Sequence, residues 1–481
     1  MKKKMTVPVV LLLLLAVTLI PVFMQQYDIL PVITSAAAPA PALVFTADPT
    51  PLPAPTEDTE IASAQKQKIL SAEAVRVLER VLPPDIPAAE FLLMTENELW
   101  PDAAEELAAV SAEDDVLALL TRRTGESPAV LRDRFFGLFD SPEKAAESNV
   151  YFADSSGSGK DTILAFVGDV NFSDEIYYVM QVFKKAANGL SGIFTGGLLE
   201  TMRAADVLMP GNEFAFTSGG APLPGKTYSF RSPPETVRIL ADMGANIAFL
   251  ANNHVFDYGP EGLSDTLKTL REAGIPPVGA GMDINEASQP VYYIVKGKKI
   301  AFVAAGCIER YGIFTPGASE AAPGIFRTDE KDPEALKEVI KAAAENSDFV
   351  VVYFHWGVEG SSTPEPYQRE LARISIEAGA DAVLGSHPHV LQGAEFHNGK
   401  PIIYSLGNFW FGLDPRDTCL LELILDEEGG AAVRFRPCVT ASGKTSLAEG
   451  EAARRILRFY ESISFGVEID GEGFIRPREE T

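Results

Sequence analysis

From residue 161 onward the chain alternates short apolar runs with amphipathic helical segments, and this alternation restricts the possible folds more than any other feature. The runs TILAFVGD at 162–169 and DFVVVYFHWG at 348–357 have the length of buried strands, and 333–346 has helical periodicity. Buried strands separated by helices of about ten to fifteen residues are typical of an α/β sheet sandwich. In such folds ligands bind beyond the carboxyl ends of the strands. We therefore expect the functional site at that edge of the sheet.

Further elements follow from the same periodicities. Helices are expected at 175–187, 234–243, 261–273 and 368–378, and a hairpin at 291–306.

The N-terminus carries a membrane signal. Lys2, Lys3 and Lys4 precede an uncharged apolar run at 5–24, which is long enough as a helix to span the hydrocarbon core of about 30 Å. The basic flank should stay in the cytoplasm, which puts the body of the chain outside the cell membrane. The alternative is a signal peptide cleaved near 36–38, which would release a secreted protein.

Composition changes along the chain suggest its organisation, with a spacer rich in Pro and Ala followed by an acidic helical pattern. We expect a membrane anchor or signal at 1–27, a Pro/Ala-rich linker at 28–59, a small helical module at 60–150, the α/β domain at 160–440 and a C-terminal extension at 441–481.

The charge balance excludes one class of partner. The chain has 67 acidic and 41 basic residues, a formal net charge of −26, whereas a protein that binds nucleic acid needs a basic surface. The three cysteines, Cys307, Cys419 and Cys438, have no CxxC spacing, so neither a zinc ribbon nor a dense disulfide framework is indicated. A single bridge between Cys419 and Cys438 stays open.

Histidines are concentrated at the ends of predicted strands. The chain has only five, and four of them, His254, His355, His387 and His389, directly follow apolar runs. A single such histidine is more often structural, but four together favour a metal centre. Imidazole and carboxylate ligands bind zinc, iron and manganese, and a carboxamide oxygen can fill a remaining position. A first-row metal is therefore favoured over calcium.

Six polar motifs carry these residues: GDVNF at 168–172, GNEF at 211–214, ANNHVFDYG at 251–259, HWGVEG at 355–360, GSHPHV at 385–390 and SLGNF at 405–409. Together, over about 162–439, they resemble the CapA family of poly-γ-glutamate capsule synthesis proteins, whose catalytic-type domain is similar to a calcineurin-like metallophosphatase. The resemblance implies a four-layer fold, a β-sandwich flanked by helices, with two divalent first-row metal ions (Mn, Fe or Zn). Gly168, Gly259 and Gly385 are expected to serve tight turns beside the ligands.

The resemblance also implies roles for individual residues. Glu213 takes the bridging carboxylate position, Asn253 ligates through its amide oxygen, and His254 faces the leaving group. The implied metal ligands are Asp169, Glu213, Asn253, His355, His387 and His389. Residues two apart in an extended segment project the same way, so the imidazoles of His387 and His389 are expected to meet one centre.

Other polar residues of the motifs have supporting roles. Asp257 and Glu359 match the family pattern and are expected to assist His254 in catalysis, by orienting ligands or substrate. Asn252 and Asn408 are candidates for substrate binding, or alternatively hold a turn and a loop.

Two basic residues, Lys226 and Arg231, stand near the motifs in KTYSFRSPP. A guanidinium binds phosphate or carboxylate in bidentate fashion, so Arg231 is a candidate clamp for either. The alternative for Arg231 is an ordinary surface salt bridge.

The sequence departs from the family pattern at two positions. Asn171 stands where metallophosphatases commonly have a histidine ligand, which loosens one of the two metal sites, and Gly211 replaces an asparagine before the bridging glutamate.

The expected chemistry is metal-assisted hydrolysis of a phosphate ester or a γ-glutamyl amide, in the synthesis, export or anchoring of poly-γ-glutamate or a related envelope polymer. Two alternatives stay open: a non-catalytic, metal-containing scaffold for membrane synthase subunits, and a γ-glutamyl amide hydrolase or transferase.

Overall fold

The computed structural model describes residues 145–146, 148–153, 159–173, 189–308, 314–412, 415–427 and 429–478. The expected membrane anchor at 1–27, the linker at 28–59, nearly all of the helical module at 60–150 and the helix at 175–187 lie outside the described residues. Within the described ranges, no helix is both long enough and apolar enough to cross a membrane.

One sheet has seven strands, in an order that mixes early and late segments of the chain. Its strands, in spatial order, are β1 (Val150–Phe152), β9 (Val291–Val295), β10 (Lys298–Cys307), β12 (Phe349–Trp356), β13 (Ala382–Ser386), β15 (Lys400–Leu406) and β14 (Leu391–His397). Strands β10, β12, β13 and β15 run parallel. The predicted hairpin is confirmed, because β9 pairs antiparallel with β10.

The second sheet has ten strands. Its main path is β20 (Val467–Ile469), β21 (Phe474–Pro477), β18 (Ala431–Ala441), β17 (Arg416–Leu425), β2 (Thr162–Val170), β3 (Val207–Asn212), β6 (Ala248–Phe249) and β7 (Pro277–Val278), with β16 (Asn408–Trp410) on β2 and β19 (Lys444–Leu447) on β18. Strands β2, β3, β6 and β7 run parallel. The segment 441–481, expected as an extension, thus contributes β19, β20 and β21 to this sheet.

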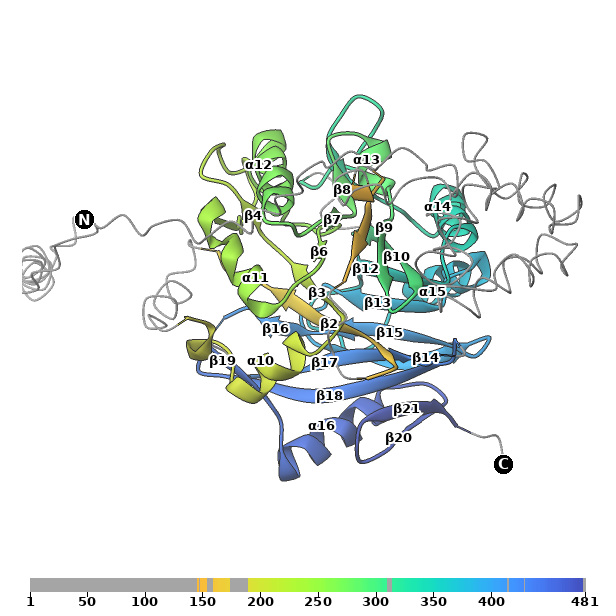
Figure 1. Ribbon diagram of the computed structural model, residues 1–481. Coiled ribbons are helices and arrows are strands. Elements are labelled where there is room, and N and C mark those ends of the chain that lie inside the picture. The colour runs from red at the N-terminus through yellow and green to blue at the C-terminus, as the bar shows by residue number, and fades with distance from the viewer. Residues whose placement is uncertain are drawn as a thin grey trace, which may run out of the picture. The chain divides into compact units, whose positions relative to one another are not determined.

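Helices cover the outer faces of both sheets, and the inner faces share one core. Because side chains alternate along a strand, Phe166 of β2 and Phe302 of β10 meet in the core between the sheets, whereas Val167 faces outward. Helices α10 (Gly196–Arg203), α11 (Arg238–Met243) and α12 (Gly259–Glu272) pack on the ten-stranded sheet, and α14 (Glu334–Glu345) and α15 (Pro366–Ala378) on the seven-stranded sheet. Figure 1 shows these two groups of helices on opposite sides. The expected mixed α/β architecture is confirmed.

Smaller elements complete the domain. They are the pairs β4 (Ala215–Phe216) with β5 (Arg231–Ser232) and β8 (Ala280–Gly281) with β11 (Gly324–Ile325), the 3-10 helices Gly189–Gly192 and Pro234–Val237, and the helices α13 (Ile284–Ser288) and α16 (Gly450–Ser462). Helix α16 buries Ile456, Leu457 and Tyr460 in the core between the sheets.

Most predicted helices are confirmed to within two residues. The segment 234–243 forms a 3-10 turn followed by α11. The helix expected at 368–378 starts earlier, at Pro366, because Glu365 and Gln368 form a capping box.

One expectation about local structure was wrong. Gly168 and Gly385 lie inside β2 and β13 rather than in turns, and a Cβ at Gly168 would overlap the carbonyl oxygen of Gly407. The bridge left open between Cys419 and Cys438 is absent, since both thiols are free. The two side chains belong to cores on opposite faces of the ten-stranded sheet, so they cannot meet.

Candidate metal centre

The carboxyl ends of parallel strands from both sheets bring the sequence-predicted ligands together. Asp169 lies near the end of β2 and Glu213 directly follows β3, both in the ten-stranded sheet. His355 lies near the end of β12 and His387 directly follows β13, both in the seven-stranded sheet. The four side chains are buried. The cluster therefore joins the two sheets at one edge.

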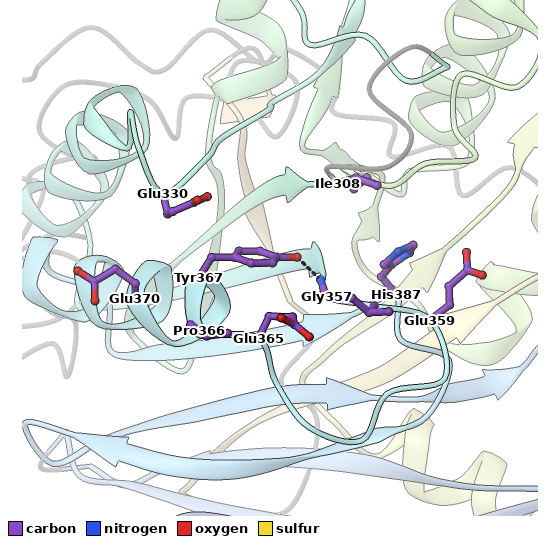
Figure 2. A pocket seen from close by; sticks show the side chains of 10 residues that line it. Ile308, Glu330, Gly357, Glu359, Glu365, Pro366, Tyr367, Glu370 and His387 are labelled. Atoms are coloured by element: carbon purple, nitrogen blue, oxygen red, sulfur yellow. Dashed lines mark hydrogen bonds between the residues drawn. The ribbon is translucent and has the colours of Figure 1, made fainter.

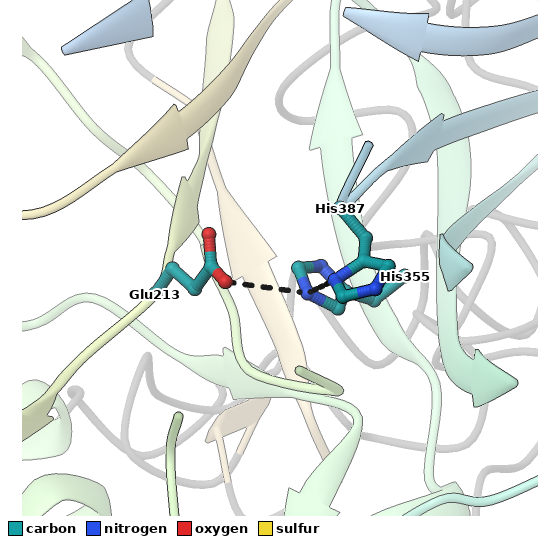
Figure 3. A group of neighbouring side chains, drawn as sticks. All are labelled: Glu213, His355 and His387. Atoms are coloured by element: carbon teal, nitrogen blue, oxygen red, sulfur yellow. Dashed lines mark hydrogen bonds and ion pairs between the residues drawn. The ribbon is translucent and has the colours of Figure 1, made fainter. Parts of the chain in front are cut away.

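The side chains form three overlapping groups that could hold a metal ion, with ligand atoms within 4.8 Å of one another. The groups are Glu213, His355 and His387; Asp169, Glu213 and His389; and Glu359, His387 and His389. Figure 3 shows Glu213 facing the imidazoles of His355 and His387. Glu213, His387 and His389 each belong to two of the groups, and of these only Glu213 offers a carboxylate that two ions could share.

Three ligand atoms converge around the Nε2 atom of His355, which is itself a fourth. This atom lies 2.7 Å from Asn253 Oδ1, 3.0 Å from His387 Nδ1 and 3.5 Å from Glu213 Oε1. Bonds of about 2.0–2.2 Å to one ion place neighbouring ligand atoms about 3 Å apart. The spacing of these atoms therefore fits the coordination sphere of one ion.

Three carboxylate oxygens of the cluster lack hydrogen-bond partners among the described residues. Asp169 Oδ1 and both carboxylate oxygens of Glu213 are buried and accept no hydrogen bond from any residue that the structure describes. A buried carboxylate without a partner is costly, and such charges in proteins are paired or coordinate metals. The donor set and these oxygens together fit a bound metal.

The electrostatics of the cluster favour cation binding. Burial, reinforced by the neighbouring Glu213, raises the pKa of Asp169 to about 6, and burial also raises the pKa of Glu213. Burial lowers the pKa of His355 to about 3 and that of His387 well below its ordinary value. Both imidazoles are therefore neutral at physiological pH, which is the form that binds metals.

His389 differs electrostatically from its two neighbours. Burial lowers its pKa, but the carboxylates of Glu213 and Asp169 act in the opposite direction, and the net effect is a raised pKa. Its Nδ1 lies 2.7 Å from Asn408 Oδ1, so Asn408 orients the ring.

The backbone of the histidine pair is not extended, and the geometric reason given for their convergence was wrong. His387 and His389 have φ angles of 95° and 59°, in the left-handed region that non-glycine residues seldom adopt. The His387 N–H donates to Asp169 Oδ2 at 3.0 Å. This bond fixes the turn against the end of β2. Strain of this kind clusters at functional sites.

His254 lies at the edge of the cluster with its two ring nitrogens in different surroundings. Its Nδ1 is 2.7 Å from Asp257 Oδ2, and its Nε2 is 3.8 Å from Glu213 Oε1. Asn252 holds the turn, because its Oδ1 accepts from the N–H groups of His254 and Val255 at 3.0 Å. Nε2 therefore faces the ligand cluster.

Three other residues that the sequence singled out have contacts of different kinds. The guanidinium of Arg231 lies over the ring of Tyr258, 4.6 Å from its centroid. Glu359 is exposed and belongs to the group with His387 and His389. Asn171 Oδ1 accepts from the Ser173 N–H at 2.9 Å, so its oxygen is engaged within its own loop.

Sequence reasoning missed two contributors. Ser386 Oγ lies 3.0 Å from His355 Nδ1 and orients that ring; its position directly before His387 was the available signal. Lys226 pairs with Asp257, although the sequence marked it only as a nearby base.

A pocket of about 980 Å³ opens beside His387 (Figure 2). Four glutamates line it, namely Glu330, Glu359, Glu365 and Glu370. Its other lining residues are apolar or neutral, including Tyr367, whose hydroxyl oxygen accepts from the Gly357 N–H at 2.6 Å. No Lys or Arg is among the described residues that line it. The space next to the cluster is therefore strongly acidic.

The mixed α/β fold and the buried carboxylate and imidazole cluster define a protein with groups of residues suited to hold metal ions. The chain belongs to the family described as Bacterial capsule synthesis protein PGA_cap, whose sequence profile matches residues 163–413. The predicted resemblance to the CapA family is thereby confirmed.

Curated relatives include two proteins named CapA. The PGA biosynthesis protein CapA of Bacillus subtilis is 36% identical over 216 residues, 44% of this chain and 55% of that protein. The capsule biosynthesis protein CapA of Bacillus anthracis is 34% identical over 225 residues, 44% of this chain and 52% of that protein. A probable polyglutamine synthesis accessory protein of Mycobacterium tuberculosis is 30% identical over 212 residues, 43% of this chain and 55% of that protein. The chain spans about half the length of the curated relatives it matches.

Proposed function

We propose that this chain is a metal-dependent hydrolase of the metallophosphoesterase type that acts in the synthesis, export or anchoring of poly-γ-glutamate or a related envelope polymer. The observation that carries the hydrolase proposal is Glu213, whose two buried oxygens lack hydrogen-bond partners among the described residues and which belongs to two ligand groups. The names of the two Bacillus relatives support the role in capsule synthesis.

In this proposal the residues that would hold two divalent first-row ions (Mn, Fe or Zn) are Asp169, Glu213, Asn253, His355, His387 and His389, with Glu213 as the carboxylate that both ions would share. When bound, such ions polarise the scissile group and lower the pKa of a bound water.

The chain's own residues orient the substrate and transfer a proton. Asp257 accepts the Nδ1–H of His254, which leaves Nε2 directed at the cluster. From there Nε2 is within reach of a leaving group; when His254 carries a second proton, on Nε2, it donates that proton to the leaving group as a general acid and is left as the neutral Nδ1–H tautomer. Neutral His355 and His387 stay available as ligands over the physiological pH range because burial lowers the pKa of both.

The acidic pocket favours a γ-glutamyl amide hydrolase or transferase as the second candidate. Cleavage of an amide releases an amine, which becomes a cation that the carboxylates of Glu330, Glu359, Glu365 and Glu370 attract. Cleavage of a phosphodiester releases an alcohol, to which these carboxylates offer no such attraction. The same carboxylates repel a free polyanion.

The setting of the reaction is part of the proposal. An N-terminal helix at 1–27 would anchor the chain with its body outside the cell membrane, next to membrane synthase subunits. The description of the mycobacterial relative as an accessory protein supports work alongside a synthase. The alternative is a metal-containing scaffold without turnover in the same complex.

The test combines metal analysis of the purified full-length protein with hydrolysis of an aryl phosphodiester and of poly-γ-glutamate. His254→Ala is expected to keep its metal and to lose turnover by about 10²- to 10⁴-fold, the usual contribution of a general acid. Preference for poly-γ-glutamate would select the amide hydrolase. Bound metal without turnover would favour the scaffold, and no bound metal would refute the site.

A further inference from the structure

Lys226 is a buried lysine that contacts two parts of the candidate centre at once. Its side chain is only 4% exposed, and its ammonium forms an ion pair with the fully buried carboxylate of Asp257. The same ammonium donates to the backbone carbonyl of Asn253. Taking both charges of an ion pair out of water is expensive. A buried ion pair does not add to solubility, so we expect this pair to have another role.

The contacts of Asp257 show what the ammonium secures. Asp257 Oδ1 accepts from Lys226, and Oδ2 accepts from the Phe230 N–H at 2.6 Å and lies 2.7 Å from His254 Nδ1. Both carboxylate oxygens are thus engaged, and the one that meets His254 has little freedom to turn away. Lys226 contacts Asp257, and Asp257 contacts His254, so the three buried side chains form one continuous series of contacts.

The second contact of Lys226 reaches the metal side of the cluster. The carbonyl of Asn253 also accepts from the Thr315 hydroxyl at 3.0 Å, and the Asn253 side chain lies 2.7 Å from His355 Nε2. One ammonium therefore restrains two consecutive residues, Asn253 directly and His254 through Asp257. A compact cation with several donors suits this position, whereas the planar guanidinium of arginine has a different shape.

We propose that Lys226 is a positioning residue, which holds Asp257 in place so that His254 keeps Nε2 directed at the reacting group. This inference rests on the proposed hydrolase function and adds a residue to it that acts without touching substrate. Removal of such supporting partners typically costs about 10- to 100-fold in activity or metal affinity.

The first arm of the test is a double-mutant cycle with Lys226→Met, His254→Ala and the combination, each as the full-length, metal-loaded protein. If Lys226 acts through His254, Lys226→Met lowers kcat about 10- to 100-fold in the wild type and has almost no further effect in the His254→Ala background. Equal losses in both backgrounds would mean that Lys226 only stabilises the structure, and would overturn the proposal.

A matched control and a conservative variant accompany the cycle. Lys296 is also largely buried, with 16% of its side chain exposed, and its ammonium lies 3.0 Å from the Asp206 carboxylate. This ion pair is not part of the cluster. Lys296→Met should therefore leave kcat unchanged. Lys226→Arg keeps the charge and guards against a variant that does not fold, and it should recover part of the loss.

The second arm does not depend on turnover. With only five histidines in the chain, ¹⁵N-histidine labelling gives few signals, and the His254→Ala variant assigns one of them. The ring of His254 should hold a fixed Nδ1–H tautomer in the wild type and exchange between tautomers in Lys226→Met. Unchanged nitrogen shifts in Lys226→Met would refute the positioning role, whereas a tautomer change in a protein without turnover would refute only the hydrolase.

Discussion

Asp169 should make the metal-free protein less stable as the pH rises. Burial, with the charge of Glu213 beside it, raises the pKa of this carboxyl from 3.8 to about 6. The folded protein therefore holds a proton that the unfolded chain releases. The resulting contribution is fully present below pH 3.8 and is lost as the pH rises to about 6. At about 1.4 kcal/mol for each pH unit of that interval, the loss is about 3 kcal/mol.

Asp169→Asn removes this loss while keeping the shape of the side chain. The amide oxygen can still accept from the His387 N–H, which the wild-type carboxylate does at 3.0 Å. Near pH 8 the metal-free variant should be more stable than the wild type by up to about 3 kcal/mol, and near pH 4 by less than about 1 kcal/mol. With metal bound, the wild type should be more stable than the variant, because the ion stabilises the folded wild type. In the variant the ion lacks the ligand that Asp169 provides.

The assay is urea unfolding of the full-length protein followed by tryptophan fluorescence, after chelation and after metal loading. Trp356 and Trp410 are fully buried and should report loss of the core. The pH dependence that histidines contribute to stability largely cancels between variant and wild type. Burial lowers the pKa of His355 from 6.5 to about 3, so both folded proteins lose stability as the pH falls below 6.5. A difference between variant and wild type that is absent near pH 8, or that does not change with pH, would refute the reasoning.

Three further predictions concern the pocket, a strand contact and the thiols. Glu330→Gln combined with Glu370→Gln should lower the KM for poly-γ-glutamate several-fold at low salt, because it removes two pocket charges that repel the polymer. The control is Glu338→Gln, on an exposed face of α14. An unchanged KM would mean that the polymer avoids the pocket. Gly168→Ala should destabilise the protein by about 3 kcal/mol or more in thermal unfolding because its Cβ meets backbone, whereas Gly196→Ala, with open space around it, should not. The three described cysteines are free, so a reducing agent should leave the midpoint of unfolding unchanged, and a shift would reveal a bridge.

The sequence predicted those parts of the site that depend on a repeating pattern. The apolar runs that become β12 and β13 end at His355 and just before His387, and parallel strands bring such ends to one edge. Asp169 and Glu213, at the ends of β2 and β3, were assigned through the resemblance to the CapA family. Residues far apart in the chain could therefore be assigned to one cluster without a structure.

Features that depend on irregular backbone or tertiary contact could not be predicted. The left-handed φ angles of His387 and His389 have no periodic signal. Lys226 stands in a loop rich in Gly and Pro that suggests a surface position, and only the neighbouring Asp257 explains its burial. The strands after residue 440 were not recognised, because β19, β20 and β21 have only four, three and four residues.

The position of the cluster between the two sheets determines when during folding a metal ion could bind there. The His387 amide and the Asp169 carboxylate that meet there are 218 residues apart in sequence, so the ligand set does not exist until both sheets have formed and met. An ion bound there would consequently be acquired at the last stage of folding and not during synthesis. For a chain that crosses a membrane unfolded, the metal supply outside the cell, and not that of the cytoplasm, would decide which ion the centre receives.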